Sequence, residues 1–175
     1  MYANNKITNY YMDAGSFPLI TILWLVLSPF WRDLHFYIVH RAMHKWNTKY
    51  IPDIGNLLYI YAHSVHHKSR NIQPWSGISM HPIEGIIYES ACLVPCLFFH
   101  HPLMINIIKV DLTLSAVLGH DGHDFPGSGD WFHYLHHTKI DCNYGSPNAP
   151  LDWLFGTVDY GDQDDIDDAR DRKTK

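Results

Sequence analysis

The sequence predicts an all-α fold: an integral membrane helical domain with a transmembrane hairpin and a cytosolic, histidine-rich helical cap. Three observations carry this prediction. Apolar runs of roughly helical length recur, histidines repeat at the spacing of a helix, and basic residues flank the first histidine-rich segments. Because Lys and Arg are enriched on the cytosolic side of membrane proteins, we expect the histidines to face the cytosol.

The composition limits the classes of protein that fit this chain. Its 175 residues suffice for one domain or for a fragment of a larger one. Fourteen histidines outnumber the thirteen lysines and arginines, so histidine is the main departure from ordinary composition. No basic arm is present, and no nucleic-acid partner is expected. The three cysteines form no paired pattern, which favours free thiols in a reducing compartment.

The charge distribution divides the chain into one domain over residues 1–158 and an acidic tail over residues 159–175. Seven aspartates lie between Asp159 and Asp171, and such a dense charge predicts a solvated, largely disordered segment. The first fifteen residues are polar and lack the order of a secretory signal. A single apolar run precedes the first histidine pair, so the alternative that the domain is truncated at its N-terminus stays open.

Two apolar runs, at residues 83–99 and 103–119, predict a helical hairpin in the membrane. Seventeen residues of α-helix extend about 25 Å, close to the hydrocarbon core of about 30 Å. The hairpin places His81 and His120 at one end and the histidines of the connecting HHP (100–102) at the other. Those two distant histidines are therefore not expected to bind a metal.

Charged residues inside both arms favour an alternative to the membrane hairpin. Charged side chains within a membrane span normally face protein or water. A soluble helical protein is therefore the alternative fold. The charged residues are Glu84, Glu89, Lys109 and Asp111.

Histidines recur in four short segments whose spacing suits metal binding. HSVHH (63–67) and HYLHH (133–137) place histidines at i, i+3 and i+4, which share one face of a helix. HRAMH adds an i, i+4 pair and HDGH an i, i+3 pair. Imidazole suits Zn, Cu, Fe and Ni, and one tetrahedral zinc takes at most four ligands. Ten candidates therefore predict a two-metal site: His40, His44, His63, His66, His67, His120, His123, His133, His136 and His137.

The nature of the donors narrows the kind of metal site. Since no cysteine is among them, an iron–sulfur cluster and a thiolate zinc site are excluded. The paired Glu-x-x-His motifs of soluble di-iron bundles are also missing. Nearby carboxylates are expected to accept the second ring N–H and fix the histidine tautomers. The candidates, for each of which a solvated loop position or a helix cap is the alternative, are Asp33, Asp121, Asp124 and Asp141.

In their order, HRAMH, HSVHH, MHPIEG, GHDGH and HYLHH resemble the fatty acid hydroxylase/sterol desaturase superfamily, and the closing NYGS…LDWLFGT is similar to its C-terminal segment. The resemblance covers Asp33 to Thr157. It implies an integral membrane oxygenase of the endoplasmic reticulum, or of the inner membrane if the protein is bacterial. Such an enzyme uses O₂ and a cytosolic, histidine-bound di-iron centre to hydroxylate or desaturate a lipid. The resemblance also implies electrons from cytochrome b5 and its reductase.

The resemblance assigns roles to individual positions of this sequence. It implies metal ligands at the ten histidines named above, with His123 the position at which members of the superfamily vary. His81, in MHPIEG, is implied to be an outer-shell or substrate-lining residue, and no catalytic residue beyond the metal ligands is expected. The MHPIEG segment favours a sterol or related lipid over other lipids.

Three alternatives to this function stay open at the level of sequence. One is a hydrolase that uses two zinc ions and a metal-bound hydroxide. Another is a membrane protein that binds metal or lipid without catalysing a reaction. The third is a simple clustering of surface histidines, which the recurrence of the same spacing disfavours.

Overall fold

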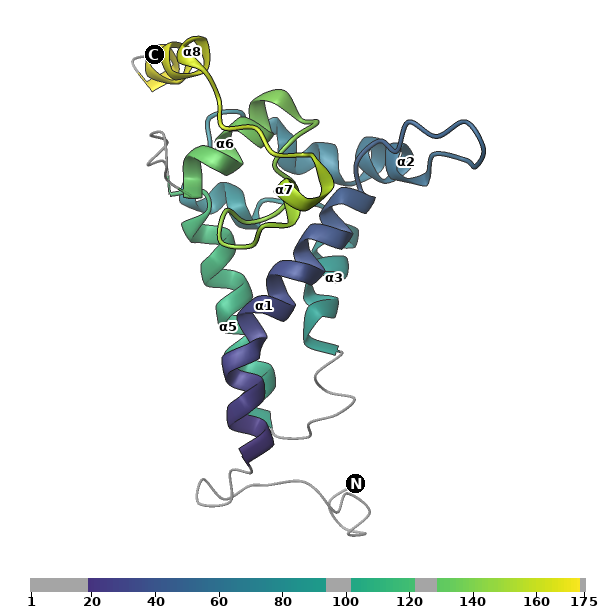
Figure 1. The fold of residues 1–175 in the computed structure, drawn as a ribbon, viewed down its shortest axis with the longest axis vertical. Coiled ribbons are helices and arrows are strands. Elements are labelled where there is room, and N and C mark those ends of the chain that lie inside the picture. Colours follow the sequence, from purple (N-terminus) through teal and green to yellow (C-terminus); the bar gives the residue numbers. More distant parts are fainter. Residues whose placement is uncertain (1–18, 94–101, 122–128, 174–175) are drawn as a thin grey trace.

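The computed structural model describes residues 19–93, 102–121 and 129–173 (Figure 1). All regular structure within these ranges is helical, which confirms the all-α prediction. The helices and 3₁₀ helices (η) are α1 (Leu19–Ala42), α2 (Ile54–Tyr61), η3 (His63–Lys68), η4 (Pro74–Ile78), α3 (Pro82–Glu89), η5 (Ser90–Cys92), α5 (Pro102–Leu118), α6 (Gly129–Lys139), α7 (Leu151–Phe155) and α8 (Gln163–Lys173).

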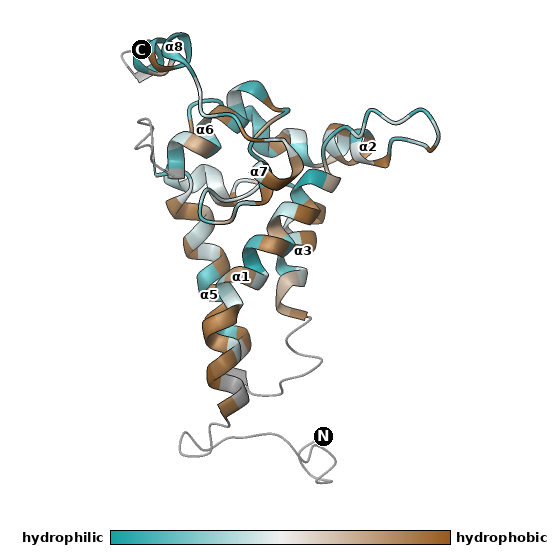
Figure 2. Cartoon of the chain, in the orientation of Figure 1, coloured by the Kyte–Doolittle hydropathy of each residue, from teal (hydrophilic) through white to brown (hydrophobic). Residues whose placement is uncertain are grey.

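The helices form a stem, made of α1, α3 and α5, that carries a helical cap, made of η3, η4, α6 and α7 (Figure 1). Inside the stem, Cys92 and Ile108 form a small buried cluster against Trp24, Leu25 and Leu112. The far end of the stem is strongly apolar, whereas the cap is mixed (Figure 2). The cap, which bears histidines, therefore packs on a stem whose far end is apolar.

The outer faces of the stem are also apolar. Val26 and Phe30 on α1 are 63% and 70% exposed, and Val110 and Leu114 on α5 are 56% and 53% exposed. Such long apolar faces are unusual on the surface of a soluble monomer and mark a region that meets a membrane or another protein.

The predicted membrane hairpin differs from the helices that the structure describes. Its first arm corresponds, as far as residue 93, to α3 and η5, and its second arm corresponds to α5, while residues 94–101, which include the two histidines of HHP, lie outside the described residues. Among the described helices, none combines the length and the apolar character needed to cross a membrane. The charges inside the arms account for part of this difference, because they interrupt the apolar runs.

Several of these charges form ion pairs between helices. Arg32 of α1 forms ion pairs with Asp111 of α5, at 2.8 Å, and with its neighbour Asp33, at 2.9 Å. Lys109 lies 3.6 Å from Glu89, which joins α5 to α3. Since Arg32 is largely buried, its pairing with Asp111 ties α1 to α5 at the level where the stem meets the cap.

The prediction of a disordered acidic tail is wrong for residues 163–173, which form α8. Ala169 is buried in a cluster with Trp131 and Leu135 of α6, and Ile166 packs against the same cluster. Lys139 of α6 also binds Asp165 at 2.8 Å. The few apolar residues of the tail thus share one helical face, and docking on α6 stabilises a helix that its charge alone disfavours. The boundary at residues 158/159 stays a prediction.

We expect Arg32→Leu to lower the free energy of unfolding by about 2–3 kcal/mol, because Asp111 and Asp33 lose a charged hydrogen-bond donor. Denaturant unfolding of the purified protein measures this change. Arg170→Gln is the control, since Arg170 belongs to an exposed ion pair on α8 and such pairs contribute little. Equal stability of the two variants would contradict a structural role for Arg32.

Candidate metal centre

Nine buried histidines gather in the cap as two groups, in each of which one nitrogen of every ring lies within 4.8 Å of the others. Group 1 consists of His40, His44, His63, His67 and His136. Group 2 consists of His66, His120, His133 and His137. The structure thus brings together nine of the ten predicted ligands, and the tenth, His123, lies outside the described residues. His35, which is not in either group, binds the Ser90 hydroxyl at 2.9 Å.

The two histidine triplets divide between the groups in opposite proportions. HSVHH gives two rings to group 1 and one to group 2, whereas HYLHH gives one to group 1 and two to group 2. HSVHH forms the 3₁₀ helix η3, and HYLHH lies in the α-helix α6. The expectation that the three rings of a triplet look the same way is therefore only partly correct. Each triplet instead spans both groups and holds them side by side.

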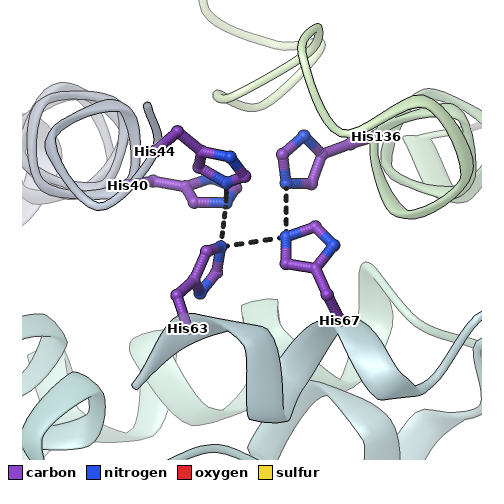
Figure 3. Close-up of side chains that lie close together, drawn as sticks. All are labelled: His40, His44, His63, His67 and His136. Atoms are coloured by element: carbon purple, nitrogen blue, oxygen red, sulfur yellow. Dashed lines mark hydrogen bonds between the residues drawn. The ribbon is translucent and has the colours of Figure 1, made fainter. Parts of the chain in front are cut away.

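The Nε2 atoms converge within each group. In group 1, His63 Nε2 lies 3.0 Å from the Nε2 atoms of both His40 and His67, and His67 Nε2 lies 3.1 Å from that of His136 (Figure 3). In group 2, the Nε2 atoms of His120 and His133 are 3.0 Å apart, and His137 Nε2 is 3.1 Å from that of His66. The rings reach each centre from three or four different elements.

Backbone carbonyls define which ring nitrogen carries the proton. His40 Nδ1 lies 2.6 Å from the Tyr144 carbonyl oxygen, and His136 Nδ1 lies 2.6 Å from that of Cys142. Because a carbonyl can only accept, Nδ1 must donate, and the Nε2 of each neutral ring then presents a lone pair. His120 Nδ1 makes the same bond, at 2.7 Å, to the carbonyl of Ala116. Lone pairs that converge in a buried site repel one another unless a cation lies among them, so the donor set fits a metal in each group.

Burial keeps the rings neutral, which is the form that binds metals. Desolvation is the main cause, and neighbouring imidazoles add to it. Burial lowers the pKa of His66 to about 4 and that of His120 to about 3. The pKa of each of the other seven histidines is also well below its ordinary value. The rings therefore carry no second proton that would compete with a metal at neutral pH.

A carboxylate that the sequence analysis did not select contacts group 1. Glu84 Oε1 lies 2.6 Å from His63 Nδ1, and both side chains are fully buried. A signal for this role was present in the sequence, because an acidic residue inside an apolar run needs a polar partner. In the predicted membrane hairpin, Glu84 is only a charged residue that interrupts the first arm.

The structure describes four of the five predicted outer-shell residues. Asp33 is paired with Arg32, and Asp141 is exposed just beyond α6. Asp121 is half-buried next to His120 in the chain, and Asp124 lies outside the described residues. His81 occupies the N-cap position of α3, where its Nδ1 accepts from the Ile83 N–H at 3.2 Å. Among the described residues, Asp33 thus binds Arg32 and His81 binds the Ile83 N–H, rather than a histidine of either group.

The segment after α6 supplies two of the carbonyl acceptors and is organised by Asp152. This buried carboxylate accepts from the N–H groups of Tyr144, at 2.8 Å, and Gly145, at 2.7 Å, and from the Thr157 hydroxyl at 2.6 Å. Asn143, which has a positive φ of 54°, turns the chain just before Tyr144. The turn-rich C-terminal segment therefore packs over group 1, and its backbone orients His40 and His136.

A close approach between η4 and α5 shapes the other side of the site. A Cβ atom at Gly77 would lie 2.0 Å from the Ala116 carbonyl oxygen and 2.9 Å from His120 Nδ1. Only glycine leaves room there for the hydrogen bond that orients His120.

Comparison with known proteins identifies relatives that carry out lipid chemistry. The chain is 30% identical over 156 residues to a Delta(7)-sterol-C5(6)-desaturase of Nicotiana tabacum, covering 83% of this chain and 52% of the relative. It is 33% identical over 139 residues to a very-long-chain aldehyde decarbonylase of Oryza sativa, covering 71% and 48%. It is 31% identical over 149 residues to a Delta(7)-sterol 5(6)-desaturase of Gibberella zeae, covering 78% and 41%.

The chain spans about half the length of these relatives. No solved structure matches it. The family model described as fatty acid hydroxylase matches residues 24–157, a range that contains every histidine of both groups and Glu84. The chain therefore belongs to the fatty acid hydroxylase family.

Proposed function

We propose that this chain is the metal-binding part of a membrane-bound di-iron oxidoreductase that uses O₂ to hydroxylate or desaturate a lipid. The observation that carries this proposal is the pair of adjacent, buried histidine groups whose unprotonated Nε2 atoms converge. Five and four neutral nitrogens leave room on each of two metals for an exogenous ligand. Membership in the fatty acid hydroxylase family supports iron as the metal and a lipid as the substrate.

The two iron ions would activate O₂. The chain's own residues would position the metals and exclude water from the site. The nine histidines would bind the metals through Nε2. Backbone carbonyls and Glu84 would accept hydrogen bonds from the Nδ1 atoms of several of these rings. Burial of the rings keeps bulk water away from the reacting atoms, which limits side reactions. The protein thus fixes the geometry, and the metal carries the difficult chemistry.

The apolar outer faces of α1 and α5 support a lipid substrate and a membrane location. These faces lead from the far end of the stem toward the cap, so a lipid beside the stem would have its path to the metal centre along apolar side chains. A sterol or a fatty acyl chain is the proposed substrate, because two of the relatives are named as sterol desaturases. Electrons would come from a donor such as cytochrome b5 with its reductase, and the metal centre would face the cytosol.

Expression of the chain in a lipid-producing host is expected to yield an oxygenated or desaturated lipid that His66→Ala does not yield. His66 belongs to group 2, and its loss removes a metal donor from the centre of the site. Mass spectrometry of total lipid extracts measures the product. His35→Ala is the matched control, since His35 lies outside both groups and should leave the product unchanged. Identical lipid profiles for wild type and His66→Ala would favour a protein that binds metal or lipid without catalysis.

Protein purified without chelators is expected to contain about two iron ions per chain. Metal analysis by inductively coupled plasma mass spectrometry, together with an assay for iron-dependent turnover, tests this expectation. Imidazole donors also suit zinc. Two zinc ions and no iron-dependent turnover would overturn the oxygenase proposal in favour of a metal-hydroxide hydrolase.

The metal-free protein is expected to lose stability as the pH falls from 7 toward 4. In the unfolded chain each histidine binds a proton below about pH 6.5. In the folded chain the pKa of His66 is lowered to about 4, so protons favour the unfolded state throughout that window. For His66 alone the loss is about 3 kcal/mol by pH 4. Thermal melts at pH 7, 6 and 5 in chelator measure it, and iron-loaded protein is the control because bound metal competes with protons. A melting temperature that stays constant over this range would contradict the burial of neutral rings.

A further inference from the structure

The two histidine groups differ in the charge of the atoms that support them. In group 2, His66 Nδ1 lies 3.3 Å from the Ser79 carbonyl oxygen, and His120 Nδ1 is held by another carbonyl. In group 1, His40 and His136 are also held by carbonyls, but His63 is held by the carboxyl group of Glu84. Hydrogen bonds to an ionised acceptor are roughly twice as strong as those between neutral groups. Glu84 is therefore a partner of group 1 that can bear a negative charge.

The start of α3 holds Glu84 in place. His81 is the N-cap residue, Pro82 is the first helical residue, and Glu84 is the third. The His81 side chain accepts from the Ile83 N–H, and the Glu84 carboxyl group interacts in return with the backbone of His81. Glu84 thus lies in the first turn of α3, where a helix N-terminus favours a negative charge. The MHPIEG segment thus fixes the position of a buried carboxylate.

Within the part of the chain that the structure describes, the partners of this carboxylate are neutral. They are the His63 ring, the Tyr88 hydroxyl one turn further along α3 and the backbone of His81. Burial of this unpaired charge is costly and raises the pKa of Glu84 to about 8. A divalent cation on Nε2 of His63 would lie across a single ring from Glu84 and would offset that cost. With Nε2 occupied, the remaining ring proton must sit on Nδ1, where it is donated to Glu84 Oε1.

We propose that Glu84 is a positioning residue whose carboxylate fixes the His63 ring and strengthens metal binding in group 1. The inference rests on the two-metal site proposed above. A carboxylate on the far side of a ligand histidine fixes the ring and raises its basicity, and loss of such a partner typically weakens metal affinity 10–100-fold.

Titration of the metal-free full chain with Co²⁺, followed by visible absorption, tests the inference. Glu84→Gln preserves the size of the side chain and an oxygen acceptor but removes the charge. We expect two Co²⁺ ions in the wild type and a dissociation constant about 10–100-fold higher for one of them in Glu84→Gln. Glu89→Gln is the matched control, because Glu89 lies on the same helix, is half exposed and pairs with Lys109. It should bind both ions as the wild type does.

Two further variants assign the weakened site. His137→Ala disables group 2 and leaves group 1 intact, whereas His44→Ala does the reverse. Glu84→Gln should weaken the remaining Co²⁺ site in the first background and leave it unchanged in the second. Circular dichroism verifies that each variant is folded, and Glu84→Asp, which keeps the charge, should retain more affinity than Glu84→Gln if the latter folds poorly.

The outcomes separate this inference from the function on which it rests. Equal Co²⁺ affinities in Glu84→Gln and wild type, or equal weakening in both histidine backgrounds, would overturn the role of Glu84. A wild-type chain that binds no pair of Co²⁺ ions would instead overturn the two-metal site itself.

Discussion

The convergence of neutral, unprotonated Nε2 atoms in two buried groups is the constraint that organises this structure. A buried imidazole with no partner for its second nitrogen is costly, so a ring that points one nitrogen at a metal needs an acceptor for the other. Ala116 and Ser79 supply carbonyls from the end of α5 and from the residue after η4, and Tyr144 and Cys142 supply them from the segment beyond α6. Much of the irregular backbone near the site is explained by this demand.

The same demand explains why the cap is assembled from short elements. Rings from α1, η3, α5 and α6 must approach two centres at once, and one long helix presents histidines along only one direction. The 3₁₀ helix η3 and the α-helix α6 each span both centres, so the two groups are held together by shared elements. A change in the packing of η3 against α6 would therefore alter both groups.

The stem differs from the cap in where its charged and apolar side chains lie. Its interior holds a small apolar cluster and the Arg32 ion pairs, while its outer faces are left apolar. Pairing charges inward and leaving the outside apolar suits a protein that meets lipid at the stem and water at the cap. The candidate metal centre lies where the two regions join.

Local spacing determined what the sequence by itself could establish. The i, i+3 and i+4 repeats indicated helical histidine clusters, and nine of the ten selected histidines do lie together, because periodicity along a helix depends only on neighbouring residues. The order of the motifs likewise indicated the family that the comparisons show. The helical character of the chain followed from the same short-range patterns.

Tertiary structure alone decided which histidine enters which group and which acceptor holds it. His40 meets Tyr144 across 104 residues of chain, and His137 meets His66 across 71, so no spacing rule relates them. For the same reason, Asp33 and Asp141, which lie near the histidines in sequence, point elsewhere, whereas Glu84 reaches His63 from another helix. The helix α8 also depends on the packing of Ile166 and Ala169 against α6. Such contacts depend on how distant elements pack, and packing energy is a property of the folded chain as a whole.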